Sequence, residues 1–178
     1  MLQMDERALV ARAAAGDMIA FASLVRTHQS RMRAFLLRVA AGDHALADDL
    51  AQDTFLEALR KIAQYRGDGS FAGWLYRIAY TRFLMHVRAR RETLTDDFLE
   101  GISASETVDA ARLDLTKSLG RLGPEERAAL TLCYALGYSN EEAAGILSLP
   151  LGTVKSHILR GREKLKAMLE PWSGEVKS

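Results

Sequence analysis

The stretch between residues 151 and 166 carries side chains of the kinds that recognise DNA. Four of them fall on one helical face, beside the apolar stripe: Lys155, Ser156, Leu159 and Arg162. Cations bind guanine edges or phosphates, a hydroxyl pairs with several base edges, and an aliphatic group fits a thymine methyl. Five basic residues against one acidic residue add attraction for phosphate. On the basic pattern alone, an alternative without DNA is equally supported. In that alternative the basic residues are solvated and another part of the chain covers Leu159.

The residues around this stretch predict how it is positioned. Residues 139–147 predict a short helix that begins with a capping box of Ser139 and Glu142. A tight turn (148–150) and a longer helix (151–169) follow. The longer helix has an inward apolar stripe: Val154, Ile158, Leu165, and Met168 or Leu169. A short helix, a turn and a longer helix form a helix-turn-helix, which favours DNA recognition over a merely solvated face.

An acidic face is expected on a helix over residues 44–65. Four residues recur there at helical spacing: Asp49, Gln52, Asp53 and Leu56. The simplest interpretation of such a face is that it is solvated. The functional alternative is a surface that docks on a basic protein.

A helix expected over residues 71–91 contains five arginines and no acidic residue. Its apolar residues form two opposite stripes: Phe71, Trp74, Leu75, Ile78 and Met85, and then Tyr76, Tyr80, Phe83 and Val87. Arginines interleaved with aromatic rings suit single-stranded nucleic acid, because cations follow the backbone and rings stack on bases. A two-sided helix is otherwise sandwiched between neighbours. Core packing is the favoured interpretation for most of these rings.

These stretches belong to a chain that we expect to be all-α. It has 178 residues, of which 48% are hydrophobic and 26% charged, as in an ordinary globular protein. Ala and Leu are abundant and β-branched runs are scarce. Capping residues and glycines predict helices over these ranges: 5–15, 18–41, 44–65, 71–91, 108–121, 124–136, 140–148 and 151–169.

The charge is distributed unevenly along the chain. The formal net charge is +1, but residues 1–91 carry +5, residues 92–111 carry −6 and residues 112–178 carry +2. The middle segment has no basic residue and little hydrophobic periodicity, which predicts a flexible acidic linker. We therefore expect two small helical domains, a first lobe (1–91) and a second lobe (112–178).

Other functional classes lack support in the sequence. No run approaches the ~20 apolar residues of a membrane span, and no secretory signal begins the chain, so a cytoplasmic protein is expected. The single cysteine, Cys133, and four histidines (His28, His44, His86 and His157) show no metal-ligand spacing, so no metal or cofactor is expected. No phosphate-binding loop, nucleophile elbow or catalytic carboxylate pair occurs, so we expect no catalytic residue and no enzyme.

Three stretches resemble motifs of the bacterial extracytoplasmic-function (ECF, group IV) RNA polymerase sigma factors of the sigma-70 family. Residues 48–55, DDLAQDTF, resemble the region 2 motif E-D-L-x-Q-[ED]-x-F. Residues 71–79, FAGWLYRIA, match F-x-x-W-L-x-x-I-A. Residues 151–162, LGTVKSHILRGR, resemble the region 4 motif G-T-V-[KR]-S-R-[LIV]-x-R-[AG]-R. The resemblance extends over roughly residues 5–169 with the family's order and spacing.

The resemblance implies a promoter-specificity factor that binds core RNA polymerase through its β and β′ subunits. It assigns core binding to Asp49, Gln52, Asp53 and Leu56. It assigns the melted −10 element to Arg66, Gly67, Asp68, Ser70, Arg77, Tyr80, Thr81 and Arg88. It assigns the −35 element to Lys155, Ser156, Leu159, Arg160 and Arg162. It further implies a stress or envelope response, an anti-sigma factor that holds the protein inactive, and no direct membrane contact.

The sequence departs from the family pattern at three positions. Thr81 and Met85 stand where the family often has Asn and Asp, and a methionine cannot replace a carboxylate. His157 replaces the usual arginine and attracts phosphate less strongly. The alternative function is a stand-alone helix-turn-helix regulator whose first lobe binds a ligand or dimerises.

Overall fold

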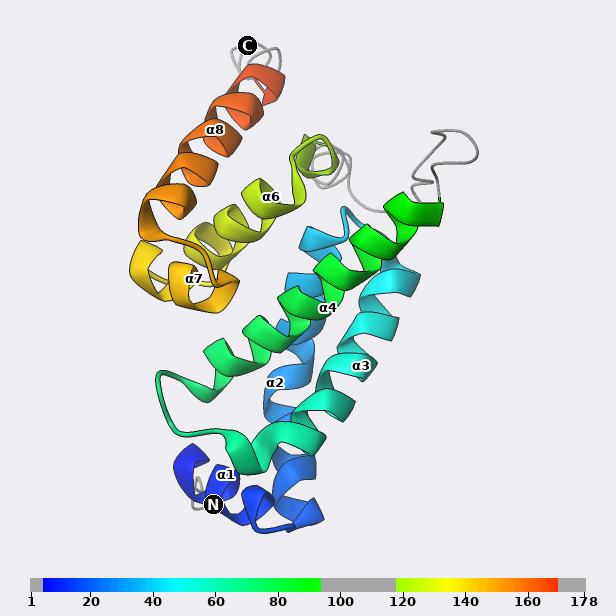
Figure 1. Ribbon diagram of the computed structural model, residues 1–178, viewed down its shortest axis with the longest axis vertical. Coiled ribbons are helices and arrows are strands. Elements are labelled where there is room, and N and C mark those ends of the chain that lie inside the picture. Colours follow the sequence, from blue (N-terminus) through cyan, green and yellow to red (C-terminus); the bar gives the residue numbers. More distant parts are fainter. Residues whose placement is uncertain (1–4, 94–117, 170–178) are drawn as a thin grey trace, which may run out of the picture.

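Helices form every regular element in the part of the chain that the structure describes (Figure 1). The structure is a computed structural model that describes residues 5–93 and 118–169. The first lobe contains α1 (Glu6–Ala14), α2 (Met18–Val39), α3 (His44–Lys61), the 3-10 turn η1 (Ile62–Gln64) and α4 (Phe71–Thr93). The second lobe contains α6 (Pro124–Leu130), the π-helical turn η2 (Thr131–Ala135), α7 (Asn140–Leu147) and α8 (Leu151–Leu169). These elements confirm the all-α prediction.

The predicted linker can be compared with the structure only at its beginning. Helix α4 continues to Thr93, so the first two residues assigned to the linker (92–111) are helical. The rest of that segment lies outside the described residues, as does most of the helix expected over 108–121, of which 118–120 are described and helical.

Helix boundaries follow from local side-chain chemistry. Asp17 accepts hydrogen bonds from the amides of Ile19 and Ala20 at 2.9 and 3.0 Å and begins α2. Ser70 accepts from the Gly73 amide at 3.0 Å at the start of α4. Glycines with positive φ follow α1 and α2: Gly16 at 95° and Gly42 at 88°. These caps and glycines were the signals that predicted the helices.

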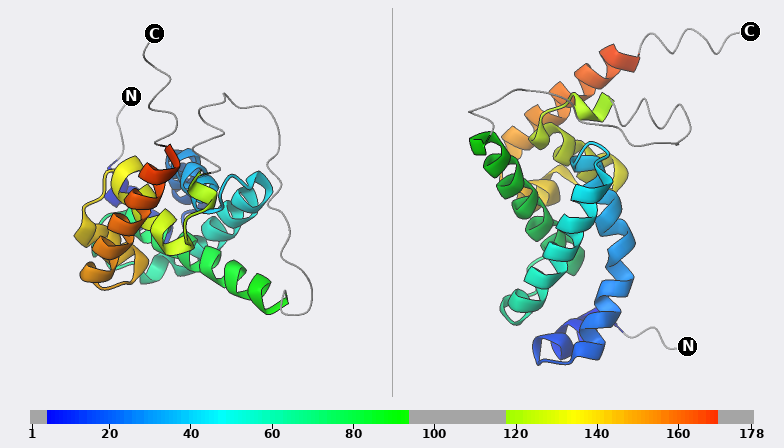
Figure 2. Two further views of the ribbon diagram at one scale, coloured as in Figure 1. Left: turned by 90° about the horizontal axis from the view of Figure 1, so that it is seen from above. Right: turned by 90° about the vertical axis from the view of Figure 1, so that its right-hand side faces the viewer.

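The first lobe is a bundle of α2, α3 and α4, with α1 packed across one end (Figures 1 and 2). Its largest fully buried side chains come from α2 and α4: Leu24, Met32, Phe35, Leu36, Val39 and Leu75. Thr54 of α3 is also fully buried, and its hydroxyl donates to the Leu50 carbonyl at 2.6 Å. The packed interior leaves the outer faces of α3 and α4 as rigid surfaces.

The second lobe holds α8 against α6 and α7. Val154 and Ile158 of the predicted inward stripe are 0% and 8% exposed. Gly161 sits on α6 so tightly that an added β-carbon would lie 2.7 Å from the Leu130 Cδ1 atom. A larger residue at 161 would therefore require either the Leu130 side chain or α8 to shift.

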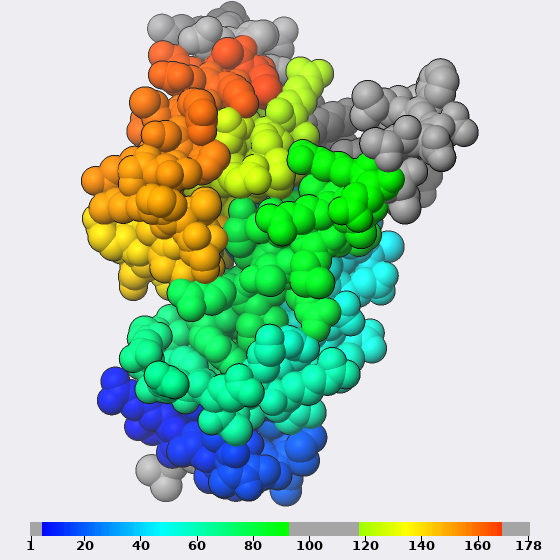
Figure 3. All heavy atoms as spheres, viewed as in Figure 1, coloured from blue at the N-terminus to red at the C-terminus, as the bar shows by residue number. Residues whose placement is uncertain are grey.

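The second lobe packs directly on the first lobe (Figure 3). Helix α7 lies on α4, while α6 and η2 lie on α2. The Tyr76 ring of α4 packs 5.0 Å from Phe35 of α2 and 5.9 Å from Tyr138 of the second lobe, measured between centroids. Helix α4 is therefore sandwiched. The core-packing interpretation of its second stripe is confirmed for Tyr76, Tyr80 and Phe83, which are at most 4% exposed.

Candidate nucleic-acid interface and protein-docking surface

The outward face of α8 presents the side chains predicted for duplex DNA. Lys155 and Ser156 are exposed, and Leu159 is 57% exposed although it is large and apolar. The Ser156 hydroxyl donates to the Gly152 carbonyl at 2.9 Å. Within the described residues, no other part of the chain buries Leu159, contrary to the alternative in which the side chain is covered. A row of this kind can approach a base edge without rearranging the lobe.

The preceding helix positions α8. The Ser139 hydroxyl accepts from the Glu142 amide at 3.1 Å, and the Glu142 carboxylate accepts from the Ser139 amide at 2.8 Å. This reciprocal pair is the predicted capping box of α7. Ser148 then adopts a left-handed conformation (φ 55°) and turns the chain into α8. The two helices and their turn form the predicted helix-turn-helix.

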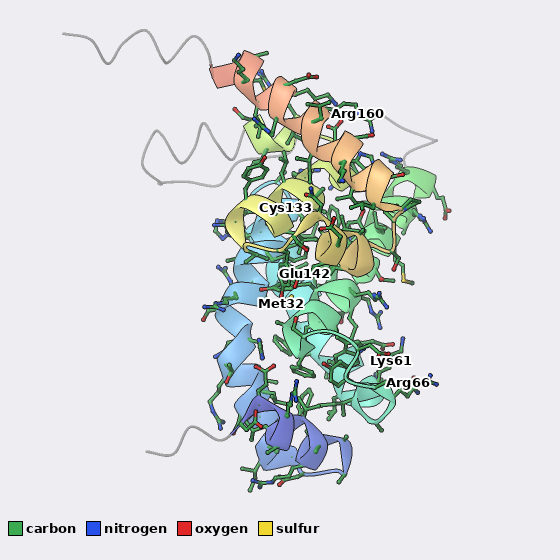
Figure 4. The ribbon with its side chains drawn as sticks, turned by 90° about the vertical axis from the view of Figure 1, so that its left-hand side faces the viewer. Met32, Lys61, Arg66, Cys133, Glu142 and Arg160 are labelled. Carbon is green, nitrogen blue, oxygen red and sulfur yellow. The ribbon has the colours of Figure 1, made fainter. Side chains whose placement is uncertain are left out.

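A carboxylate from α6 engages two of the cations on α8. Glu126 has only 9% of its side chain exposed, and both oxygens accept from Lys164 Nζ, at 2.8 and 2.9 Å. The Arg160 Nε atom lies 3.9 Å away, and Figure 4 shows Arg160 along α8. Burial raises the pKa of Glu126, but Lys164, the Gly123 amide and Arg160 together hold it below the usual range. Lys164 therefore has a structural role. Arg160 lies near two residues of its own lobe, since its Nη2 atom is also 3.2 Å from His157 Nδ1.

The loop before α4 is exposed from Arg66 to Ser70. Gly67 and Gly69 have φ angles of 80° and 83°, which glycine adopts without strain. The Tyr65 hydroxyl donates to the Gly69 carbonyl at 3.0 Å and braces the loop. Figure 4 shows Arg66 at the outer edge of the first lobe. The loop residues predicted for nucleic acid are thus brought together on one surface.

Helix α4 presents Arg77, Thr81, Met85 and Arg88 as exposed side chains. The Thr81 hydroxyl donates to the Arg77 carbonyl at 2.9 Å. Arg77 itself contacts the second lobe, because its Nε and Nη2 atoms donate to the Gly145 carbonyl at 3.1 and 2.5 Å. Tyr80 departs from the expectation for the −10 element, since it is 3% exposed and its ring is unavailable to DNA in this arrangement.

The acidic residues of α3 divide into paired and open groups. Asp48 bonds Arg33 of α2, and Glu57 bonds Arg82 of α4 at 2.7 Å. These contacts tie α3 to its neighbours, and Arg33 holds the pKa of Asp48 below its usual range. The four residues predicted for docking are all exposed: Asp49, Gln52, Asp53 and Leu56. We call these four the acidic face of α3.

Two features were missed by reasoning from the sequence. Glu126 and Lys164 are separated by 38 residues, so no helical spacing connects them. Tyr138, between two predicted helices, packs on Tyr76 of the other lobe. The sequence carries no local signal for either contact, because each depends on how separate helices come together.

Side chains that could ligate a metal are scattered within the described ranges (5–93 and 118–169). No group of three or more His, Cys, Asp or Glu residues there could hold a metal ion. Cys133 is half-buried, and burial raises the pKa of its thiol. None of the described helices is both long enough and apolar enough to span a membrane.

Both lobes match models of one protein family. Residues 24–93 match Sigma-70 region 2, and residues 112–165 match Sigma-70, region 4. The chain is 38% identical to the ECF RNA polymerase sigma factor SigE of Mycolicibacterium smegmatis over 92% of this chain and 68% of that protein. It is 32% identical to the RNA polymerase sigma-H factor of Pseudomonas aeruginosa over 96% and 97% of the two chains.

Solved structures agree with this relationship. The sigma factor RpoE, in complex with the anti-sigma factor NepR from Bartonella quintana, has a TM-score of 0.73 and 29% identity over 84% of this chain and 96% of that chain. CnrH, in complex with the cytosolic domain of CnrY, has a TM-score of 0.69 and 30% identity over 93% and 97%. The chain therefore belongs to the ECF RNA polymerase sigma factors of the sigma-70 family.

Proposed function

We propose that this chain binds core RNA polymerase and directs it to promoters with a −10 and a −35 element. The observation that carries the proposal is the open row of Lys155, Ser156 and Leu159 on a helix held by a capped helix-turn-helix. The first lobe (1–91) takes the polymerase and the melted −10 strand, and the second lobe (112–178) takes the −35 duplex. The acidic segment (92–111) joins the lobes through the polymerase.

The −35 face consists of Lys155, Ser156, Leu159, Arg160 and Arg162. Lys155 and Arg162 are exposed, and neither forms an ion pair with another described residue, so both are available to phosphates or guanine edges. Leu159 supplies apolar contact for a thymine methyl. Arg160 must exchange its proximity to Glu126 and His157 for DNA, which predicts a smaller contribution from this side chain.

The −10 face consists of the loop 66–70 and the exposed α4 residues Arg77, Thr81 and Arg88. Backbone turns at two glycines leave this loop open for an extruded base, and the arginines follow the strand. Melting then needs no covalent step, because binding of the extruded base offsets unstacking, which costs a few kcal/mol. Met85, exposed in the same row, offers apolar contact rather than a carboxylate.

The acidic face of α3 is the docking surface for core polymerase, on the β′ subunit. Its two open carboxylates fit a basic partner, and the half-exposed Leu56 provides an apolar centre. The proposal includes an anti-sigma partner. It is supported by two structural neighbours of this chain: RpoE was solved in complex with the anti-sigma factor NepR, and CnrH was solved in complex with the cytosolic domain of CnrY. The chain acts in the cytoplasm by binding alone, without catalysis, cofactor or direct membrane contact.

The test is in vitro transcription with purified core polymerase. Added protein should form a stoichiometric complex with core and produce promoter-dependent transcripts from genomic fragments. Absence of both the complex and the transcripts would refute the proposal. Tight, specific binding to a duplex without polymerase would instead support the stand-alone regulator, although the match of the first lobe to Sigma-70 region 2 argues against it.

A further inference from the structure

The loop before α4 (66–70) is anchored at both ends but open at its tip. Tyr65, which precedes the loop, donates its amide hydrogen to a carbonyl of the 3-10 turn η1 at 3.1 Å. Ser70, the last residue of the loop, accepts from the Gly73 amide of α4 at 3.0 Å. The tip, residues 66–68, is exposed and forms no hydrogen bond with any other described residue. The polar groups of the tip are therefore open to a ligand, while the ends of the loop are fixed to η1 and α4.

One side-chain hydroxyl sets the backbone conformation between these ends. The Tyr65 hydroxyl donates to the Gly69 carbonyl at 3.0 Å. Gly69 is in a left-handed conformation (φ 83°), which is one of several conformations that a glycine adopts at similar cost. Burial raises the pKa of Tyr65, so the hydroxyl keeps its proton and remains a donor at neutral pH. The hydrogen bond therefore selects one loop conformation among those open to Gly69.

The ring that carries this hydroxyl is itself held by aromatic packing. The centroid of the half-buried Tyr65 ring lies 5.6 Å from that of Phe71 and 5.3 Å from that of Trp74, both on α4. Phe71 is 4% exposed, and its ring meets His28 of α2 at 5.5 Å in an edge-on arrangement. The ring of Tyr65 cannot swing away without losing its contacts with α4. Its hydroxyl is therefore a fixed anchor for the loop.

An anchored loop binds a ligand at lower entropic cost than a loop that must first be ordered. Fixing the backbone of a residue costs conformational entropy, and a binding loop that is ordered in advance does not pay this cost on binding. The saving is largest where the ordered segment is short and rich in glycine, because glycine loses the most conformational freedom. Two of the five residues in the loop 66–70 are glycines. Loss of the anchor should therefore weaken binding at the tip of the loop even when the fold is intact.

We propose that Tyr65 is a positioning residue for the −10 strand, whose hydroxyl holds the loop 66–70 in the conformation that receives the extruded base. This inference rests on the proposed function of the −10 face. Tyr65 acts through the Gly69 carbonyl and does not touch the DNA. Because the anchor concerns only this loop, it affects promoter opening and leaves core docking at α3 and duplex binding at α8 unchanged.

The test is Tyr65→Phe, which removes the hydroxyl and keeps the packed ring. In the free chain, the order parameters of the Gly67 and Gly69 amides from ¹⁵N relaxation should fall. In the holoenzyme, the equilibrium constant for promoter opening should fall about fivefold, the factor that one net hydrogen bond contributes. Opening is measured by the fluorescence of 2-aminopurine placed in the −10 element of a promoter that the wild type transcribes. Core affinity and melting temperature should stay unchanged, since the lost hydrogen bond is exposed.

A matched variant and the wild type separate the possible outcomes. Tyr134→Phe makes the same chemical change at a tyrosine of the second lobe that is 63% exposed, and it should alter neither loop order nor promoter opening. A wild-type holoenzyme that opens no promoter speaks against the proposed function. If the wild type opens promoters, equal opening by Tyr65→Phe overturns the inference. Reduced opening with unchanged order parameters also overturns it, because the hydroxyl would then act on the DNA directly.

Discussion

Arg77 of α4 donates hydrogen bonds from Nε and Nη2 to the Gly145 carbonyl of α7, 68 residues further along the chain. The guanidinium has an amide oxygen as its partner in this contact, and this distinguishes it from Arg82 on the same helix. Arg82 pairs at 2.7 Å with the Glu57 carboxylate and joins α4 to α3. Arg77 thus makes a contact between the two lobes, whereas Arg82 makes a contact within the first lobe.

This difference predicts opposite consequences for two alanine substitutions. Arg77→Ala should leave the melting temperature of the protein nearly unchanged and reduce open-complex formation, because the proposed −10 contact is lost. Arg82→Ala should lower the melting temperature, because Glu57 loses its partner on α4. Calorimetry measures the melting temperature of both variants, and permanganate footprinting measures open-complex formation. Normal open complexes with Arg77→Ala would remove this residue from the −10 face.

Charge reversal on α3 tests the docking surface. Asp53→Arg should weaken binding to core polymerase by at least about tenfold, because it places a cation against the basic partner expected there. Glu163→Arg makes the same change of charge on α8, where the residue is exposed, and should leave core affinity unchanged. Affinity is measured by fluorescence anisotropy of labelled protein. Equal affinities for the two variants would contradict the assignment of the acidic face.

Most helix boundaries could be predicted because their signals are local. The capping box of Ser139 and Glu142 and the cap at Ser70 lie within a few residues of the helices they begin. The interior of the helix expected over 124–136 differs, since it changes to a π-helical turn after Leu130. Nothing in the local spacing signals that change.

The environment of the candidate sites was less predictable than their position. Exposure of Leu159 and of the acidic face of α3 agrees with periodicity, which separates inward from outward faces. Burial of Tyr80 and the engagement of Arg77 depend on contacts between lobes. A pattern within one helix cannot reveal which neighbour covers its second apolar stripe.

Two lysines on α8 provide a matched pair for the −35 face. Lys155→Ala should weaken promoter binding of the holoenzyme and reduce the slope of log affinity against log salt by about 1, because one phosphate contact is lost. Lys164→Ala should mainly lower the melting temperature, because Lys164 bonds Glu126. Filter binding across a salt series and thermal unfolding distinguish the two. An unchanged salt slope for Lys155→Ala would show that Lys155 does not contact phosphate.

The contact of Glu126 with α8 predicts a pH dependence of stability. The lowered pKa of Glu126 means that folding favours its ionised form, so its contribution is present above the ordinary Glu pKa and is lost as pH falls through the lower folded value. Glu126→Gln should lower the free energy of unfolding by about 1 kcal/mol near neutral pH. The loss is smaller than for a fully buried ion pair, because Lys164 is half exposed and solvent screens its charge. Urea unfolding at a series of pH values should show the difference between variant and wild type shrinking in acid. A difference that stays constant down to pH ~3 would assign the loss to packing rather than charge.

Two glycines of α8 differ in the space around them, so alanine should affect them with opposite sign. A β-carbon at Gly161 would lie 2.7 Å from Leu130 Cδ1 and 3.5 Å from Glu126 Cβ, in a buried contact between α6 and α8. Gly161→Ala should therefore lose about 1 kcal/mol, because overpacking outweighs the better helix propensity of alanine. Gly152 has no atom within 4 Å of the added carbon, and Gly152→Ala should gain up to about 0.5 kcal/mol. Chemical denaturation measures the free energy of unfolding of both variants. A gain in stability at both positions would mean that Leu130 moves aside without cost, and that the close approach of α8 to α6 does not require glycine.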